Sequence, residues 1–207
     1  MAFVKKHVAQ DVQEFPSFES LEEAIIYYKD NDLFEHKKYA IEEMVFFEGG
    51  ADYLVKILSD VTTEKAIDME VASVLESIDP EEAPIEAVME LLKLHNAYVR
   101  NLGISILRNY GEAIKYYIVK FLIGDDRDLR IFAINVLGDV NFPESRDMLI
   151  ELLEGESDIN VAMTAVDYMA EIGEEEDVDL LLSLKEHFNN DPYVEFGVNN
   201  AIQMIRG

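Results

Sequence analysis

The feature that most constrains the fold is an apolar pattern of about thirty residues that occurs several times along the chain. Its clearest copies begin at aliphatic anchors spaced by 30, 32 and 33 residues, namely Val99, Leu129, Val161 and Val194. Small or apolar residues follow each anchor at offsets of four, eight and eleven, which is the spacing of one face of an α-helix. A fixed period of this length predicts stacked helical units, none of which can bury its apolar face alone.

A helix-capping residue stands three positions before each of these anchors. These residues are Asn96, Asp126, Asp158 and Asp191. Their short side chains accept hydrogen bonds from the free backbone N–H groups of a first helical turn. Turn signals follow each apolar pattern, among them Gly111, Pro143 and Gly173. We therefore expect each unit to be a pair of helices joined by a short turn.

Two earlier segments fit the same columns less regularly. His36 stands on the anchor column of the first, and Ile67 on that of the second. Ser20 and Glu23 have the spacing of a capping box and predict a leading helix, which Pro16 separates from the preceding residues. The predicted organisation is an N-terminal tail at 1–19 and one repeat domain at 20–207, with a leading helix at 20–30, repeats at about 33–59, 63–94, 96–123, 126–154 and 158–188, and a capping helix at 191–206.

Composition narrows the class of protein. Apolar residues make up 49% of the chain, which is enough to bury a core. The absence of cysteine excludes a disulfide framework and a thiolate metal site. Met1–Gln10 lacks the apolar stretch of a secretory leader, and no segment approaches the roughly eighteen apolar residues that predict a membrane-spanning helix. We expect a cytoplasmic protein with no membrane partner.

Net charge is the second strong signal. With 43 acidic and 17 basic residues the chain carries a formal charge of −26, which repels phosphate backbones and excludes nucleic acid as an expected partner. The charge is unevenly distributed. Residues 95–130 have a net charge of +2, whereas residues 61–94 carry −7 and residues 131–207 carry −14. One unit is thus a basic island between acidic neighbours.

Three short sequence segments resemble motifs of a known family. They are Asp126-Arg127-Asp128-Leu129-Arg130, Val136-Leu137-Gly138 and Asp191-Pro192-Tyr193-Val194. Over about residues 33–206 the chain resembles HEAT-like repeats, and most closely the short variety also found in phycobilisome lyases. The arginine that follows the anchor in that variety is kept only as Arg100 and Arg130. The predicted fold class is all-α, a right-handed α-solenoid of antiparallel helix pairs. The resemblance further implies convex first helices and second helices that line a concave face.

The residues predict no catalytic, metal or cofactor site. None of the histidines, which are His7, His36, His95 and His187, has the adjacent glutamate seen in HEAT-like di-iron hydroxylases. Carboxylate pairs are too abundant to identify an acid and a base, and the acidic run at 174–177 is explained by a helix dipole. Without cysteine or a Gly-x-Ser-x-Gly elbow, no nucleophile stands out. We expect a protein that is not an enzyme.

The basic island suggests a binding surface on the second helices. If Ile114, Ile118, Phe121 and Leu122 face the core, then Lys115, Tyr116 and Lys120 should face a groove. Acidic residues should flank them, with Glu86 and Glu90 before and Glu151 and Asp179 after. This order of charges would align a basic protein or peptide. Alternatively, these lysines pair with acids of neighbouring repeats and only hold the stack, as Arg100 and Arg130 are expected to do.

The favoured function is a non-enzymatic scaffold or adaptor that binds a partner protein or peptide along its concave face. The alternative, implied by the phycobilisome relatives, is a lyase-like or chaperone-like accessory protein that handles a cofactor or a modified protein. A third reading, a DNA glycosylase built on a HEAT-like solenoid, is disfavoured because no cationic groove is present. Oligomeric state has no signal in the sequence.

Overall fold

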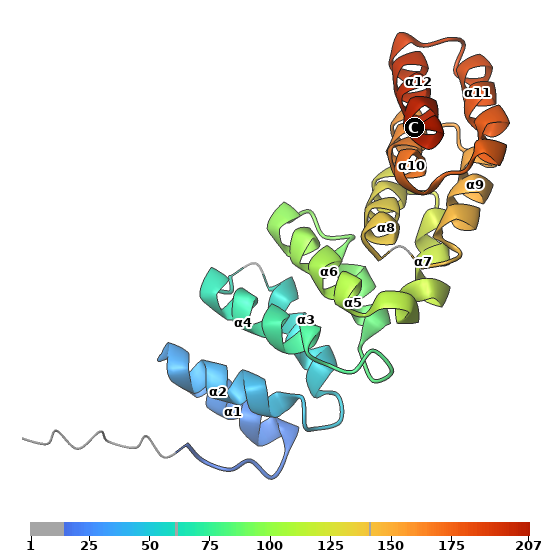
Figure 1. Cartoon of the computed structure of the whole chain (residues 1–207). Coiled ribbons are helices and arrows are strands. Elements are labelled where there is room, and N and C mark those ends of the chain that lie inside the picture. The colour runs from blue at the N-terminus through green and yellow to red at the C-terminus, as the bar shows by residue number, and fades with distance from the viewer. Residues whose placement is uncertain (1–14, 61, 141) are drawn as a thin grey trace, which may run out of the picture.

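A computed structural model describes residues 15–60, 62–140 and 142–207. Within these residues the regular structure consists of twelve α-helices and two short 3-10 helices, with no strand. The helices follow one another in pairs along a bent array, and the first and last units lie at opposite ends (Figure 1). The predicted all-α solenoid is confirmed.

Two rows of helices build the array, after a leading helix α1 (Leu21–Asp30). The first helices of the units are α2 (Phe34–Met44), α4 (Lys65–Glu76), α6 (Ala97–Asn109), α8 (Arg127–Val140), α10 (Ile159–Ile172) and α12 (Pro192–Arg206). The second helices are α3 (Gly50–Ser59), α5 (Ile85–Leu91), α7 (Lys115–Leu122), α9 (Ser145–Gly155) and α11 (Val178–His187). The 3-10 helices η1 (Gly111–Ile114) and η2 (Glu175–Asp177) precede α7 and α11.

Each unit is covered by the next one. The first helices from α2 to α12 pack against one another in chain order, and the second helices pack onto the first helix of the following unit, as α3 does on α4 and α7 on α8. The buried apolar residues of all units form one continuous cluster. This serial packing is what the thirty-residue period predicts, because each apolar face needs a neighbour.

The four predicted helix caps are present. Oδ1 of Asn96 accepts from the Tyr98 N–H at 3.1 Å, and Oδ1 of Asp126 accepts from the Asp128 N–H at 2.9 Å. The equivalent bonds at Asp158 and Asp191 measure 2.9 and 2.8 Å. Each side chain satisfies an N–H that the helix itself cannot pair.

The expected capping box at α1 forms only in part. The Ser20 hydroxyl accepts from the Glu23 N–H at 3.3 Å, as predicted. The Glu23 carboxylate, however, accepts from the Glu19 N–H at 2.9 Å and not from that of Ser20. Just before this cap, Phe15 stacks on Tyr39, and the Tyr39 hydroxyl donates to the Pro16 carbonyl at 2.8 Å. The described part of the predicted tail therefore packs on α2, while residues 1–14 lie outside the described residues.

Small residues mark the close helix contacts. Gly103, Ala133 and Ala165, which occupy one column of the repeat, are all buried. A Cβ at Gly103 would lie 3.3 Å from the Leu91 Cβ, so α5 and α6 approach closely there. At Gly138 a Cβ would lie 1.8 Å from the Tyr168 ring, which leaves no room for a side chain between α8 and α10.

Exposed apolar side chains occur near the C-terminal end of the array. Leu182 of α11 is exposed, whereas Leu181 and Leu184 are buried. The capping helix α12 exposes Asn199 and Gln203, as a terminal helix should, yet Tyr193, Phe196 and Met204 are exposed as well. The end face is thus partly apolar. The grouping of 20–207 into one domain stays a prediction.

Among the described helices, none combines the length and the apolar character that crossing a membrane requires.

Candidate partner-binding surface

Basic side chains link consecutive units of the array. The pairs are Lys38–Glu70 at 2.6 Å, Arg108–Asp139 at 3.5 Å, Lys120–Glu86 at 3.2 Å, Arg130–Glu156 at 2.7 Å, Arg146–Asp177 at 2.7 Å and Arg206–Glu175 at 2.7 Å. Most join residues about thirty positions apart, which is one repeat. Several of the few cations of this acidic chain therefore hold units together, and carboxylates remain in excess on the surface.

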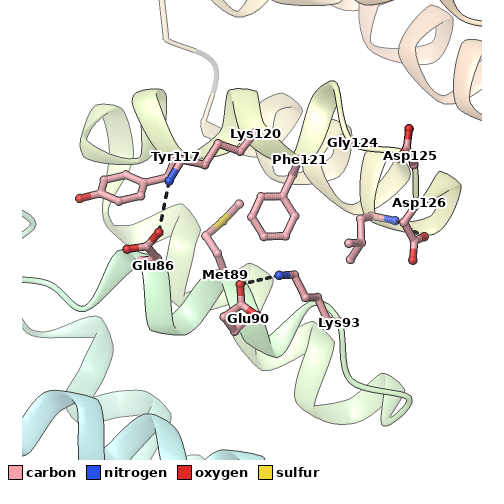
Figure 2. Close-up of a pocket in the computed structure, with 11 residues that line it drawn as sticks. Glu86, Met89, Glu90, Lys93, Tyr117, Lys120, Phe121, Gly124, Asp125 and Asp126 are labelled. Atoms are coloured by element: carbon pink, nitrogen blue, oxygen red, sulfur yellow. Dashed lines mark hydrogen bonds and ion pairs between the residues drawn. The ribbon is translucent and has the colours of Figure 1, made fainter.

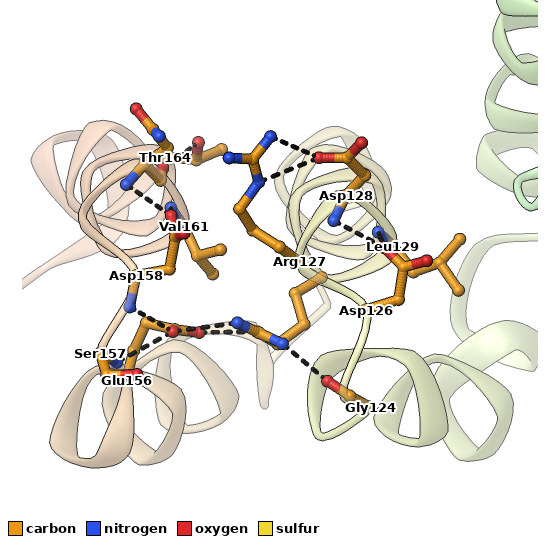
Figure 3. A network of polar contacts seen from close by, with 12 residues as sticks. Gly124, Asp126, Arg127, Asp128, Leu129, Glu156, Ser157, Asp158, Val161 and Thr164 are labelled. Atoms are coloured by element: carbon orange, nitrogen blue, oxygen red, sulfur yellow. Dashed lines mark hydrogen bonds and ion pairs between the residues drawn. The ribbon is translucent and has the colours of Figure 1, made fainter.

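The two arginines after the anchors have matching structural contacts. Arg130 Nη1 donates to the Gly124 carbonyl at 2.8 Å, and its Nε and Nη2 donate to the Glu156 carboxylate at 2.7 and 3.1 Å. Figure 3 labels the two acceptors, Gly124 and Glu156, at the ends of the dashed lines. Arg100 Nη1 donates to the Leu94 carbonyl at 2.7 Å, and its guanidinium lies 4.9 Å from the centre of the Phe132 ring. In both cases the arginine fastens the connector six residues before it, in agreement with the expected structural role.

Lys115 does not lie where its helical position suggested. Its ammonium group pairs with the Glu144 carboxylate in the turn between α8 and α9, and its side chain is about three-quarters buried. The hydrogen bond raises the pKa of Lys115 and lowers that of Glu144. Lys115 therefore faces the next unit and not a groove beside Tyr116. For this residue the alternative explanation, pairing between repeats, describes the geometry.

Between α5 and α7 lies a groove of about 260 Å³, here called the α5–α7 groove. Its apolar floor is formed by Met89, Phe121 and Leu129. Its rim carries four carboxylates and two ammonium groups, from Glu86, Glu90, Asp125, Asp126, Lys93 and Lys120. Figure 2 shows Met89 and Phe121 between the two helices, with the charged side chains around them.

The two lysines of this groove are held at its sides. Lys120 pairs with Glu86 at 3.2 Å, and Lys93 pairs with Glu90 at 2.6 Å, as the dashed lines in Figure 2 show. The Lys93 ammonium also lies 5.4 Å from the centre of the Phe121 ring. All four of these charged side chains are well exposed, so each pair contributes little free energy and can exchange partners. A basic ligand could therefore replace either lysine.

A second groove, the α7–α9 groove, lies on the other side of α7 and encloses about 480 Å³. Leu122, Ile123 and Leu152 line it together with Glu151. Asp125 borders both grooves. Of the predicted partner-binding residues, the structure thus brings Glu86, Glu90 and Lys120 together in the first groove and places Glu151 in the second. Asp179, on α11, lines neither groove.

Tyr116 belongs to a surface that the sequence analysis recognised only in part. Tyr116, Val119 and Ile123 are exposed by 82%, 37% and 76%, and they follow one another along the outer side of α7. We call these three residues the α7 ridge. Their spacing of three and then four residues is helical, so the sequence did contain a signal for Val119 and Ile123.

Metal ions need sets of several ligand side chains that lie close together. No group of three or more His, Asp or Glu residues among the described side chains is placed to hold a metal ion. His36 contacts the Tyr27 hydroxyl through Nδ1, and His187 Nε2 lies 3.1 Å from the Glu156 carbonyl oxygen. These two histidines have local structural partners.

Comparison with known proteins identifies the repeat type. Residues 117–195 match the family model described as HEAT repeats. No curated protein matches the chain. The phycobilisome-lyase-like subtype stays a prediction.

Solved structures with similar folds include an engineered protein from the Northeast Structural Genomics Consortium, with 19% identity, a TM-score of 0.42, and coverage of 90% of this chain and 96% of that chain. A designed armadillo repeat protein has 15% identity and a TM-score of 0.41, with coverage of 90% and 100%. Another designed armadillo repeat protein, in complex with the peptide (KR)4, has 17% identity and a TM-score of 0.38, with coverage of 89% and 91%.

Proposed function

Residues 117–195 belong to the HEAT-repeat family, and from this premise we propose that the chain is a non-enzymatic scaffold that binds a protein or peptide with a basic surface along its second helices. The observation that carries this proposal is the α5–α7 groove. An apolar floor surrounded by surplus carboxylates can bury an apolar side chain while the rim attracts Lys or Arg.

The charged rim and the apolar floor of the groove contribute differently to binding. Ion pairs at an exposed rim contribute at most about 1 kcal/mol each, so the apolar floor has to supply most of the affinity. The carboxylates raise the association rate for a basic partner and disfavour an acidic one, including a nucleic acid. That the second helices form the concave side of the array stays a prediction. No arrangement of described residues favours the lyase-like or chaperone-like alternative.

The experiment compares capture of partner proteins by the unaltered chain and by two charge-reversed variants. Glu90→Lys with Asp125→Lys reverses two carboxylates of the groove. Asp179→Lys with Glu186→Lys makes the same change in charge on α11, where both residues are exposed. We expect the groove variant to lose the proteins retained by the unaltered chain, and the α11 variant to keep them.

Circular dichroism melting of both variants serves as the control for folding. If the groove variant and the α11 variant retain the same proteins in the same amounts, the α5–α7 groove does not bind the partner, and the proposal fails.

A further inference from the structure

The α7 helix is apolar on two opposite sides. Ile114, just before it, and Ile118 and Leu122 within it are buried against the core. The α7 ridge, Tyr116, Val119 and Ile123, points the other way and is exposed. A helix that only covers a core needs a polar outer face, since exposed apolar side chains gain nothing from water. The ridge is therefore a second apolar surface of α7, formed by other residues than those buried in the stack.

Negative charge accompanies the ridge on both sides. Glu90 and Asp125 border the α5–α7 groove, and Glu151 borders the α7–α9 groove. Asp125 and Glu151 make no ion pair within the part of the chain that the structure describes. Lys115 is turned away to Glu144, and Lys120 is held by Glu86. An apolar line remains, bordered by two carboxylates without an ion pair in the described chain, those of Asp125 and Glu151.

We infer that the α7 ridge binds an amphipathic helix of the partner, whose apolar stripe covers the ridge and whose Lys or Arg side chains on both sides of that stripe reach the carboxylates of the two grooves. This inference rests on the proposed function and specifies the partner of the same surface. Exposed apolar residues at helical spacing match the way one helix packs its side chains between those of another.

The positions of the acids favour a helix over an extended peptide. The two grooves lie on opposite sides of α7, and a helix with its side chains is about 10 Å wide. An extended peptide in one groove would leave Tyr116 and Val119 of the ridge, which line neither groove, and the carboxylates of the other groove unused. A helix lying along the ridge presents long basic side chains on both flanks, and their apolar stems can cover the edges of the ridge.

Three synthetic peptides of eighteen residues test the inference. The first places Leu at helical spacing with Lys on both sides of the stripe, the second has the same composition in scrambled order, and the third replaces Lys with Glu. Affinities are measured by fluorescence anisotropy at about 0.15 M salt. We expect the first peptide to bind at least about tenfold more tightly than the second, and the third not to bind.

Variants of the ridge identify the binding surface. Tyr116→Ser with Ile123→Ser should weaken binding of the first peptide at least about tenfold, because the apolar contact is lost. Phe46→Ser with Phe196→Ser is the matched control, since these rings are 78% and 75% exposed elsewhere on the chain. The control variant should bind the peptide as the unaltered chain does. Equal losses in both variants would overturn the inference.

Failure of the inference can be told apart from failure of the proposed function. If the scrambled basic peptide binds as tightly as the helical one, and Glu90→Lys with Asp125→Lys abolishes both, the groove binds basic partners but not helices. The proposed function then stands and the helix inference is wrong. If neither basic peptide binds, the helix inference is also wrong, and the capture experiment with the groove variants decides the proposed function by itself.

Discussion

Replacing Arg130 by Met should destabilise the array, because it leaves a buried carboxylate without its counter-charge. Arg130 is 15% exposed, and the Glu156 carboxylate that it pairs with is 5% exposed. The Glu156 Oε1 atom also accepts from the N–H groups of Ser157 and Asp158, at 2.9 and 2.8 Å. Without the guanidinium, this carboxylate would be buried without a counter-charge, and the Gly124 carbonyl would lose its donor.

The expected cost follows from burial. Breaking a buried ion pair by removing one partner costs about 3 to 5 kcal/mol, and we expect the lower end because two backbone N–H groups still stabilise the Glu156 carboxylate. For a chain of this length, about 3 kcal/mol corresponds to a fall in Tm of roughly 6 to 12 °C. The equivalent change Arg100→Met removes one hydrogen bond and one ring contact, so we expect a loss of about 1 to 2 kcal/mol.

Urea denaturation followed by circular dichroism measures these free energies of unfolding. The unaltered chain, Arg130→Met, Arg100→Met and one double variant are compared. Arg130→Met with Glu156→Gln removes the buried charge but leaves an oxygen for the Ser157 and Asp158 N–H groups. It should recover a large part of the stability lost in Arg130→Met. Equal losses for Arg130→Met and Arg100→Met, or no recovery in the double variant, would refute the reasoning.

Three further outcomes are expected. Burial, with a smaller contribution from Asp60, raises the pKa of Asp68, whose Oδ1 has no hydrogen-bond partner, so the charged form is disfavoured in the folded chain. Asp68→Asn should therefore raise Tm at pH 7. This gain in Tm should shrink as pH falls through the pKa of Asp68 in the folded chain, and it should vanish near pH 4. Melting curves recorded across this pH range would check both expectations. Ala133→Leu or Ala165→Leu should cost about 1 to 3 kcal/mol, since these positions are fully buried in the small column, and an unchanged urea midpoint would contradict the register. Duplex DNA should not be retained in a gel-shift assay at about 0.2 M salt, because a net charge of −26 opposes contact with several phosphates.

Much of the fold could be predicted because its determinants are local. A cap such as Asp158 acts on N–H groups two and three residues ahead, and an anchor such as Val161 is buried together with residues four and eight positions later. These distances are fixed by helix geometry, so a single sequence reveals them. The same holds for Arg130, whose bond to Gly124 spans six residues.

The binding surface was less predictable because its determinants are not local. Lys115 pairs with Glu144, which is 29 positions away in the next unit. The sequence did not reveal this partner because a long flexible side chain on a helix has several acidic residues within reach. Helical periodicity gives the direction of a Cβ but not the partner of an ammonium group. Val119 and Ile123 were missed for another reason. Once Ile118 and Leu122 had been assigned to the core, the remaining apolar residues of α7 had no assigned role.

The structure separates the charges that hold the array from those that can bind a partner. Arg130 and Glu156 lie buried between units, so changing them alters how one unit supports the next. Asp125 and Glu151 border the grooves beside the α7 ridge and make no ion pair with another unit in the described chain. Changes at the first pair should therefore lower Tm, whereas changes at the second pair should lower the affinity of the folded chain for the partner and leave Tm nearly unchanged. If melting and affinity instead changed together in both sets, the ridge and its carboxylates would be part of the stack, and a partner would have to bind elsewhere on the molecule.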